Sequence, residues 1–230
     1  MVKITKYKIS IYYFISLGYM VFSLVLGIIL QDGLVIFLAW NMFLATLVFF
    51  ISTILVYLYK RKAKLWLILV VLGIYILFFP NSMYMLTDFI HIQNYTFFID
   101  YASIYNYSIA EWFVFMHILI GALYAAKLGI SSINNLEKVF KKHFLGYFGI
   151  LLSFLFFLSS FGIFIGRFLR FNTWNFIEVI SQIGIVFSHG NFLLGFVGIF
   201  FVIHWVMYFL FLNKECNMNI ENNKKLEGNT

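Results

Sequence analysis

Apolar residues run along this chain in long blocks that short polar or basic segments separate. A membrane-spanning helix needs about 20 mostly apolar residues, and six blocks approach or exceed that length. They cover residues 9–30, 33–58, 65–80 together with the residues just after Pro80, 109–130, 144–165 and 192–212. The pattern predicts an all-α integral membrane bundle of about six transmembrane helices, which forms a single domain over residues 1–212. We expect residues 131–143 to form a short cytoplasmic loop and residues 213–230 a polar, disordered cytoplasmic tail.

A shorter block, WNFIEVISQIGIVF at residues 174–187, is the main alternative to a bundle of six spans. It has only 14 residues and carries Glu178, Ser181 and Gln182 on one side. A short amphipathic stretch of this kind is typical of a helix that lies in the membrane interface. We therefore expect an outer interfacial helix here, and a seventh span is the alternative.

Composition agrees with a membrane protein and excludes a water-soluble one. Hydrophobic residues make up 63% of the chain and charged residues 11%, and the mean hydropathy is +0.94. Soluble domains carry roughly a quarter of charged residues. The net charge of +7 comes from small clusters between the apolar blocks. Because no basic face forms, the lipid bilayer is the expected partner and nucleic acid is not.

The distribution of basic residues predicts the orientation of the bundle. If the N-terminus lies in the cytoplasm, the cytoplasmic segments hold 14 of the 16 lysines and arginines, and the outer segments hold only Arg167 and Arg170. Cytoplasmic loops of membrane proteins carry an excess of Lys and Arg. We therefore predict a multi-pass protein of the cell (cytoplasmic) membrane with both termini in the cytoplasm.

The third apolar block contains the only proline, within FFPNSMYMLTDFIHI at residues 78–92. The 15 residues before Pro80 give about 22 Å of helix, which is less than the hydrocarbon thickness of about 30 Å. Proline lacks a backbone donor and clashes with the preceding turn. We therefore expect the third span to kink or break at Pro80, and Asn81 or Ser82 to cap a renewed helix over residues 82–93.

That renewed helix would carry a polar stripe. At 100° per residue, one face about 100° wide holds Tyr84, Thr87, Asp88 and His91. Asp88 and His91, at i and i+3, are near enough to form a hydrogen bond or to share a ligand. A charge within a membrane costs at least about 2.5–3.5 kcal/mol on insertion scales, so such residues tend to mark function. Asp88 and His91 are therefore the candidate catalytic residues, and a tolerated kink in which Asp88 pairs with an arginine is the alternative.

A second polar cluster is GRFLRFNTWNF at residues 166–176. Its two arginines, Arg167 and Arg170, would repel each other at i and i+3 unless an anion lies between them. Guanidinium groups match the geometry of carboxylates and phosphates, so we assign anion binding to these arginines and to Asn81. The alternative is snorkelling of the arginines to lipid headgroups. The candidate anions are Asp88, Asp100, Glu111, Glu178 and a lipid phosphate.

The histidines give only a weak indication of a metal. His91 and His189 lie at similar predicted depths and His117 lies a few residues into the fourth apolar block, but neither HExxH nor HxxxH spacing occurs, and Asp-x-x-His alone is not specific. We therefore predict no cofactor. A divalent metal at these histidines is the less favoured alternative to histidines that form hydrogen bonds between helices.

Two motif blocks, P-N-x-x-Y-x-x-T-D-x-x-H and G-R-F-L-R-x-N-[ST]-W, resemble those of a bacterial family of multi-pass membrane proteins known only as a domain of unknown function. The matching positions are Pro80, Asn81, Tyr84, Thr87, Asp88, His91, Gly166, Arg167, Arg170, Asn172 and Trp174. The resemblance implies an integral membrane protein and no particular activity. It adds Tyr84, Thr87, Asn172 and Trp174 as supporting residues. Asn175 stands where the family pattern has an aspartate, which puts an acidic role there in doubt.

The predicted topology brings both blocks to the same, extracytoplasmic side of the membrane. The sharpest hypothesis is one composite site, in which the arginines bind an anion and Asp88 and His91 supply acid–base groups. Its substrate would be a phosphorylated lipid or a lipid-linked molecule, and whether the protein is an enzyme stays open. One alternative is a transporter or binding subunit whose half-helix N-terminus at residues 81–82 faces an anionic solute. The other is a structural membrane protein in which Asp88 pairs with an arginine.

Overall fold

The computed structural model describes residues 2–99, 104–140, 146–169, 184 and 190–211. The elements in chain order are α1 (Val2–Leu30), α2 (Gly33–Lys60), α3 (Leu65–Phe78), α4 (Asn81–Tyr84), the 3₁₀ helix η1 (Met85–Asn94), α5 (Ile109–Phe140), α6 (Phe148–Phe164), the π-helix η2 (Ile165–Leu169) and α9 (Gly190–Phe211). This part of the chain is helical apart from turns, connecting segments and one isolated bridge between Phe98 and Tyr105. The expected all-α fold is confirmed.

Six stretches of the described chain are long and apolar enough to cross a membrane. They are Ile11–Leu30, Gly33–Lys60, Leu65–Asn94, Ile109–Phe140, Phe148–Leu169 and Gly190–Phe211. Each contains most or all of one predicted apolar block, so the protein is a multi-pass membrane protein. The stretch 174–187 lies outside the described residues except for position 184, and the tail 213–230 lies wholly outside them. The interfacial helix and the tail therefore stay predictions.

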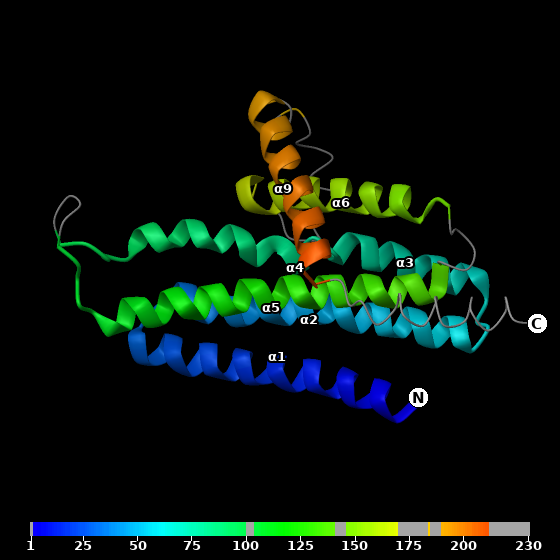
Figure 1. Cartoon of the computed structure of the whole chain (residues 1–230), viewed down its shortest axis with the longest axis horizontal. Helices are drawn as coiled ribbons and strands as arrows, with labels where there is room; N and C mark the ends of the chain where they lie inside the picture. The colour runs from blue at the N-terminus through cyan, green and yellow to red at the C-terminus, as the bar shows by residue number, and fades with distance from the viewer. Residues whose placement is uncertain (1, 100–103, 141–145, 170–183, 185–189, 212–230) are drawn as a thin grey trace, which may run out of the picture.

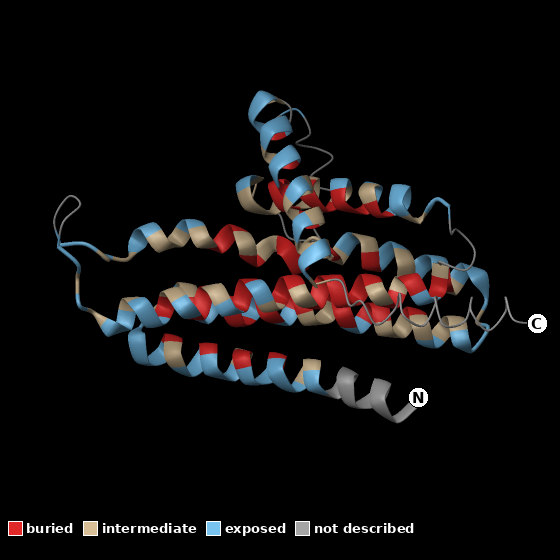
Figure 2. Ribbon diagram, in the orientation of Figure 1, coloured by how far each residue is buried: buried red, intermediate tan, exposed pale blue. Residues whose placement is uncertain are grey.

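The bundle is arranged in layers around α2 and α5, which lie against each other at its centre (Figure 1). Helix α1 covers one side of this pair, and α3, α4 and η1 form a row on the other side (Figure 1). Helix α6 lies beyond that row, and α9 runs obliquely across α6. Buried residues concentrate in α2 and α5 (Figure 2). The exposed faces of the outer helices are apolar, as at Phe14, whose exposed fraction is 76%, so this surface suits lipid.

The expected loop at residues 131–143 is wrong over most of its length, because α5 continues to Phe140. Its polar residues form hydrogen bonds inside the bundle and do not require a loop. Asn135 Nδ2 donates to Ser52 Oγ of α2 at 3.0 Å, and the hydroxyls of Ser132 and Tyr75 lie 2.7 Å apart. A polar sequence thus continues the helix where neighbouring helices supply the partners.

The expected kink or break at Pro80 takes a milder form. Helix α3 ends at Phe78 and α4 begins at Asn81, but Pro80 keeps helical dihedrals (φ −52°, ψ −32°) and the row runs on in the same direction (Figure 1). Contrary to expectation, Asn81 and Ser82 do not cap the next helix. Their side chains donate back to the carbonyls of Phe78 and Phe79, at 2.9 and 2.8 Å. This supplies donors at the end of α3, where proline has no N–H.

The renewed helix also differs from the α-helix that the pattern predicted over residues 82–93. Only Asn81–Tyr84 is α-helical, and Met85–Asn94 is a 3₁₀ helix. Residues three apart eclipse each other in a 3₁₀ helix. Asp88 and His91 therefore stand in one row, and Met85 joins them there.

Glycines on the neighbouring helices allow this segment to pack closely. A Cβ atom at Gly129 of α5 would collide with Ser82 Oγ, and one at Gly162 of α6 would come within 2.7 Å of Pro80 Cγ. Small residues let membrane helices approach closely. The PNSMYM segment is therefore fixed between α5 and α6, and this contact sets the position of the polar residues that follow it.

Candidate functional site

Asp88 is the buried centre of a polar cluster between η1, α2 and η2. Its side chain has an exposed fraction of 0%. Arg167 Nη1 donates to Asp88 Oδ1 at 3.1 Å, and Asn41 Nδ2 donates to Asp88 Oδ2 at 2.8 Å. Burial of a carboxylate is unfavourable unless the charge is paired and its oxygens accept hydrogen bonds. Both conditions are met here.

Arg167 connects this carboxylate to the rest of η1. Its Nη2 donates to the carbonyl of Thr87 at 3.1 Å and lies 2.9 Å from His91 Nε2. Its guanidinium carbon also lies 5.9 Å from the centre of the Tyr84 ring, within the range of a cation–π contact. One arginine therefore contacts four of the residues in the segment from Tyr84 to His91.

The contact with Arg167 determines the tautomer of His91. A guanidinium has five N–H donors and no acceptor, and neutral imidazole has one donor and one acceptor nitrogen. His91 Nε2 must therefore accept the hydrogen bond from Arg167. The imidazole is neutral in this arrangement, and its proton is on Nδ1.

The cluster has a buried side and an accessible side. Asp88 is fully buried, whereas the Arg167 side chain has an exposed fraction of 16% and His91 is half-buried. Among the described residues, Arg167 uses three of its five N–H groups in hydrogen bonds. The remaining donors and the His91 Nδ1–H suit a ligand with anionic oxygens.

Two unusual helices meet at this cluster. Asp88 and His91 lie on the 3₁₀ helix η1, and Arg167 lies on the π-helix η2 at the end of α6. Runs of 3₁₀ helix longer than about 4 residues are uncommon, and π-helical turns occur frequently at functional sites. The backbone on both sides of the ion pair thus departs from the α-helix that continues elsewhere in the bundle.

The comparison with protein families covers all the residues of this cluster. The model of a family described as "Protein of unknown function (DUF1361)" matches residues 40–210, about three quarters of the chain. This chain belongs to the DUF1361 family. The resemblance that the two motif blocks indicated is therefore confirmed at the level of the family. No curated protein and no solved structure matches the chain.

The part of the chain that matches DUF1361 includes Asn41, Asp88, His91 and Arg167, whereas α1 lies before it. The family description names no activity. Any functional conclusion for this DUF1361 protein therefore depends on the geometry of its own residues.

The sequence predicted most of the cluster that the structure brings together. Arg167 contacts Asp88, His91, Tyr84 and Thr87 as described above, and the Thr87 hydroxyl donates to the Tyr84 carbonyl at 2.7 Å. Asn81 has a described bond to the Phe78 carbonyl, and its assignment to anion binding stays a prediction. The predicted site residues that lie outside the described residues are Arg170, Asn172, Trp174 and His189.

Asn41 is the member of the site that the sequence reasoning missed. It lies on α2, 47 positions before Asp88, and neither motif block includes it. The available signal was an asparagine within the apolar block 33–58, because a polar side chain in a membrane span usually requires a partner. Its partner Asp88 could not be identified from the sequence, since no pattern gives the rotation of α2 against η1.

His117 forms contacts between helices, as the more favoured interpretation of the histidines predicted. His117 Nε2 lies 2.6 Å from Ser23 Oγ of α1, and its ring stacks on Tyr19 with 4.4 Å between centroids. His91 instead contacts Arg167. In the described part of the chain no group of three or more His, Cys, Asp or Glu side chains is placed to hold a metal ion. The metal alternative stays untested, because His189 lies outside that part.

Proposed function

We propose that this protein binds the anionic headgroup of a phosphorylated lipid or lipid-linked molecule at the accessible side of the Asp88–Arg167–His91 cluster. The uneven distribution of basic residues supports an extracytoplasmic location of this site in the cell membrane, with both termini in the cytoplasm. Arg170 lies three residues beyond Arg167 in the sequence, and the proposal assigns it a second cation for the same headgroup.

The observation that carries the proposal is the fixed position of a partly exposed arginine. Contacts with Asp88, Thr87, His91 and Tyr84 hold the guanidinium in place. Hydrogen-bond donors that are already ordered lose little conformational entropy when an anion binds. The Asp88 charge lies on the buried side, so an approaching anion meets guanidinium and imidazole N–H groups first.

We assign different roles to the two candidate catalytic residues, Asp88 and His91. Both Asp88 oxygens already accept hydrogen bonds, so Asp88 acts as a positioning residue for Arg167. His91 is half-buried and carries its proton on Nδ1, where it can donate to a phosphate oxygen. If the bound molecule reacts, His91 is the group in this cluster that transfers a proton.

A structural role is the second candidate, and one observation favours it. The bonds from Arg167 to Asp88 and to the Thr87 carbonyl connect the end of α6 to η1, and they need no ligand. Removing one partner of a buried ion pair costs about 3–5 kcal/mol. Stability alone therefore cannot distinguish the two candidates, and the experiment must measure ligand binding in a variant that still folds.

The double variant Asp88→Asn/Arg167→Gln fulfils this requirement, because it removes both charges and leaves neither one unpaired. Its binding of phosphatidic acid, with phosphatidylcholine for comparison, can be measured by native mass spectrometry of the detergent-solubilised protein. Lys62→Gln, which removes an exposed positive charge in the turn between α2 and α3, is the matched control.

We expect the control to bind phosphatidic acid like the wild type and the double variant to bind it about tenfold more weakly or worse. Loss of one charge-assisted hydrogen bond, about 1.5–3 kcal/mol, accounts for this change. Circular dichroism and size-exclusion chromatography verify that the double variant folds. Equal binding of phosphatidic acid by wild type and double variant would leave only the structural role.

A further inference from the structure

The segment between η1 and α5 forms a hairpin, which we define as residues 95–99 and 104–108. Ile99 N donates to the Ile104 carbonyl and Asn106 N to the Phe97 carbonyl, both at 2.8 Å. Phe98 and Tyr105 form the bridge between these bonds, and their rings lie 4.9 Å apart. The described part of the hairpin therefore has paired backbone groups and a defined shape.

The hairpin is also attached to the helices beneath it. Tyr95 Oη donates to Asp32 Oδ2, in the turn between α1 and α2, at 2.6 Å. Burial, and then the hydrogen bond and charge of Asp32, raise the pKa of Tyr95, so this hydroxyl keeps its proton at neutral pH. In the second half of the hairpin, Asn106 Nδ2 donates to Glu111 Oε2 of α5 at 3.2 Å. These bonds limit the positions that the hairpin can take.

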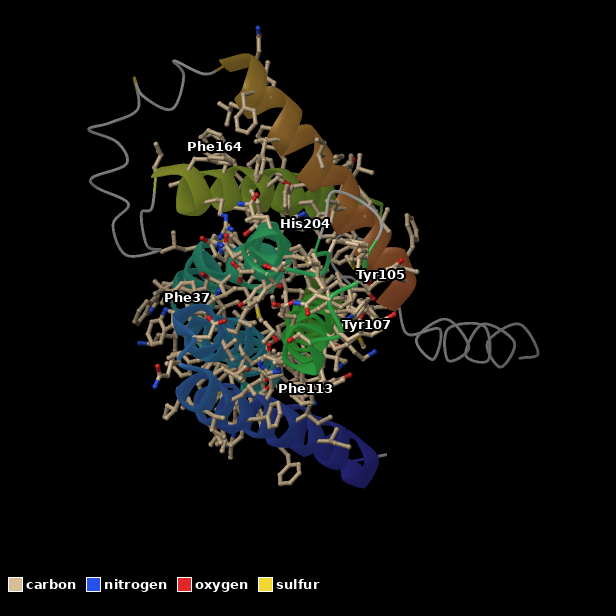
Figure 3. The ribbon with its side chains drawn as sticks, turned by 90° about the vertical axis from the view of Figure 1, so that its left-hand side faces the viewer. Phe37, Tyr105, Tyr107, Phe113, Phe164 and His204 are labelled. Carbon is tan, nitrogen blue, oxygen red and sulfur yellow. The ribbon has the colours of Figure 1, made fainter. Side chains whose placement is uncertain are left out.

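Large apolar and aromatic side chains of the hairpin nevertheless point away from the protein. Tyr107 has an exposed fraction of 93% and Ile99 one of 67%, and Ile104 and Tyr105 are exposed as well. Residues 95–99 and 104–109 contain no Lys, Arg, Asp or Glu. In the view from this end of the bundle, Tyr105 and Tyr107 lie toward its edge on the side of α5 (Figure 3). A contiguous exposed apolar patch usually marks a protein or membrane contact.

We propose that this hairpin inserts its apolar side chains into the boundary between headgroups and acyl chains of the same bilayer. The patch is continuous in sequence with lipid-facing residues of the two spans that it joins, which include Ile90 of η1 and Phe113 of α5. Tyrosine rings, apolar with one polar end, favour this depth of the membrane. The hairpin would thus anchor the end of the bundle that holds the Asp88 cluster. This anchoring does not depend on whether the Asp88 cluster binds a headgroup.

Site-directed spin labelling can measure the depth of the hairpin. The chain contains one cysteine, Cys216, so Cys216→Ser gives a background for single labels in the full-length protein in phosphatidylcholine vesicles. Labels at Tyr107→Cys and Ile99→Cys are compared by power saturation with oxygen, which concentrates in lipid, and with a water-soluble nickel complex. Two control labels give reference values. Phe14→Cys, on the exposed face of α1, is the reference for lipid, and Lys62→Cys, in a polar turn, is the reference for water.

We expect both hairpin labels to have accessibilities between those of the two controls. Their accessibility to oxygen should be well above that of the Lys62 label. Their accessibility to the nickel complex should be at least several-fold below that of the Lys62 label. Nickel contact as high as at the Lys62 label would show a water-exposed hairpin and overturn the proposal. Low contact with both reagents would show that a protein surface, such as a second copy of the chain, covers the hairpin, and this would overturn it too.

Discussion

The two partners of the buried ion pair are predicted to contribute unequally to stability. Asp88 has an exposed fraction of 0% and the Arg167 side chain one of 16%. In Arg167→Gln the carboxylate stays in a site without water, so we expect a loss of about 3–5 kcal/mol. In Asp88→Asn the arginine recovers part of its solvation, and Asn41 keeps an oxygen to donate to. We expect a loss of about 1.5–3 kcal/mol there, the value of a hydrogen bond to a charged group.

The double variant Asp88→Asn/Arg167→Gln completes a thermodynamic cycle. Independent losses would add up, whereas the double variant leaves no buried charge unpaired, so we expect it to be more stable than Arg167→Gln alone and about as stable as Asp88→Asn. Unfolding of the purified protein in mixed detergent micelles, followed by circular dichroism, gives all four free energies. A larger loss for Asp88→Asn than for Arg167→Gln would contradict the burial argument, and additive losses would show that the two side chains do not interact.

Three further predictions concern the surroundings of the site. Gly129→Ala should cost about 1–3 kcal/mol through overpacking, whereas Gly73→Ala, with open space at its Cβ, should leave the melting temperature unchanged. Asn41→Leu removes a donor to Asp88, and we expect a loss of about 1.5–3 kcal/mol in the same unfolding assay. Tyr95→Phe should be less stable than the wild type below pH 10.0, the ordinary tyrosine pKa. Because the folded-state pKa is raised, this difference should shrink as the pH rises above that value; a constant difference would contradict it.

The sequence predicted the spans, and the part of the site that contains Asp88 and His91, because both depend on local pattern. Apolar length gives the spans, and the spacing of Asp88 and His91 places them together in an α-helix as well as in a 3₁₀ helix. Arg167 stood out because it and Arg170 depart from the charge distribution of the other basic residues. Its contact with Asp88, 79 positions away, was one of several pairings that the predicted topology allowed.

The features that the sequence did not predict depend on tertiary contacts. The path through Pro80 depends on the close approach of Gly129 and Gly162 to the PNSMYM segment, and spacing alone does not reveal such contacts between helices. The 3₁₀ conformation of η1 and the π-helical turn at Arg167 have no local signature in these residues. Asn41 joins the site only through the rotation of α2. The continuation of α5 past residue 130 depends on partners such as Ser52, which a polar sequence does not show.

A phosphorylated headgroup is proposed to bind where Arg167 and His91 present their N–H groups. ¹⁵N NMR of histidine-labelled protein in nanodiscs tests this binding most directly, with the His91 signals assigned by their loss in His91→Gln. We predict a neutral His91 with its proton on Nδ1, and a shift of that Nδ1 signal when phosphatidic acid replaces part of the phosphatidylcholine. A His91 signal that is the same with and without phosphatidic acid would contradict the claim.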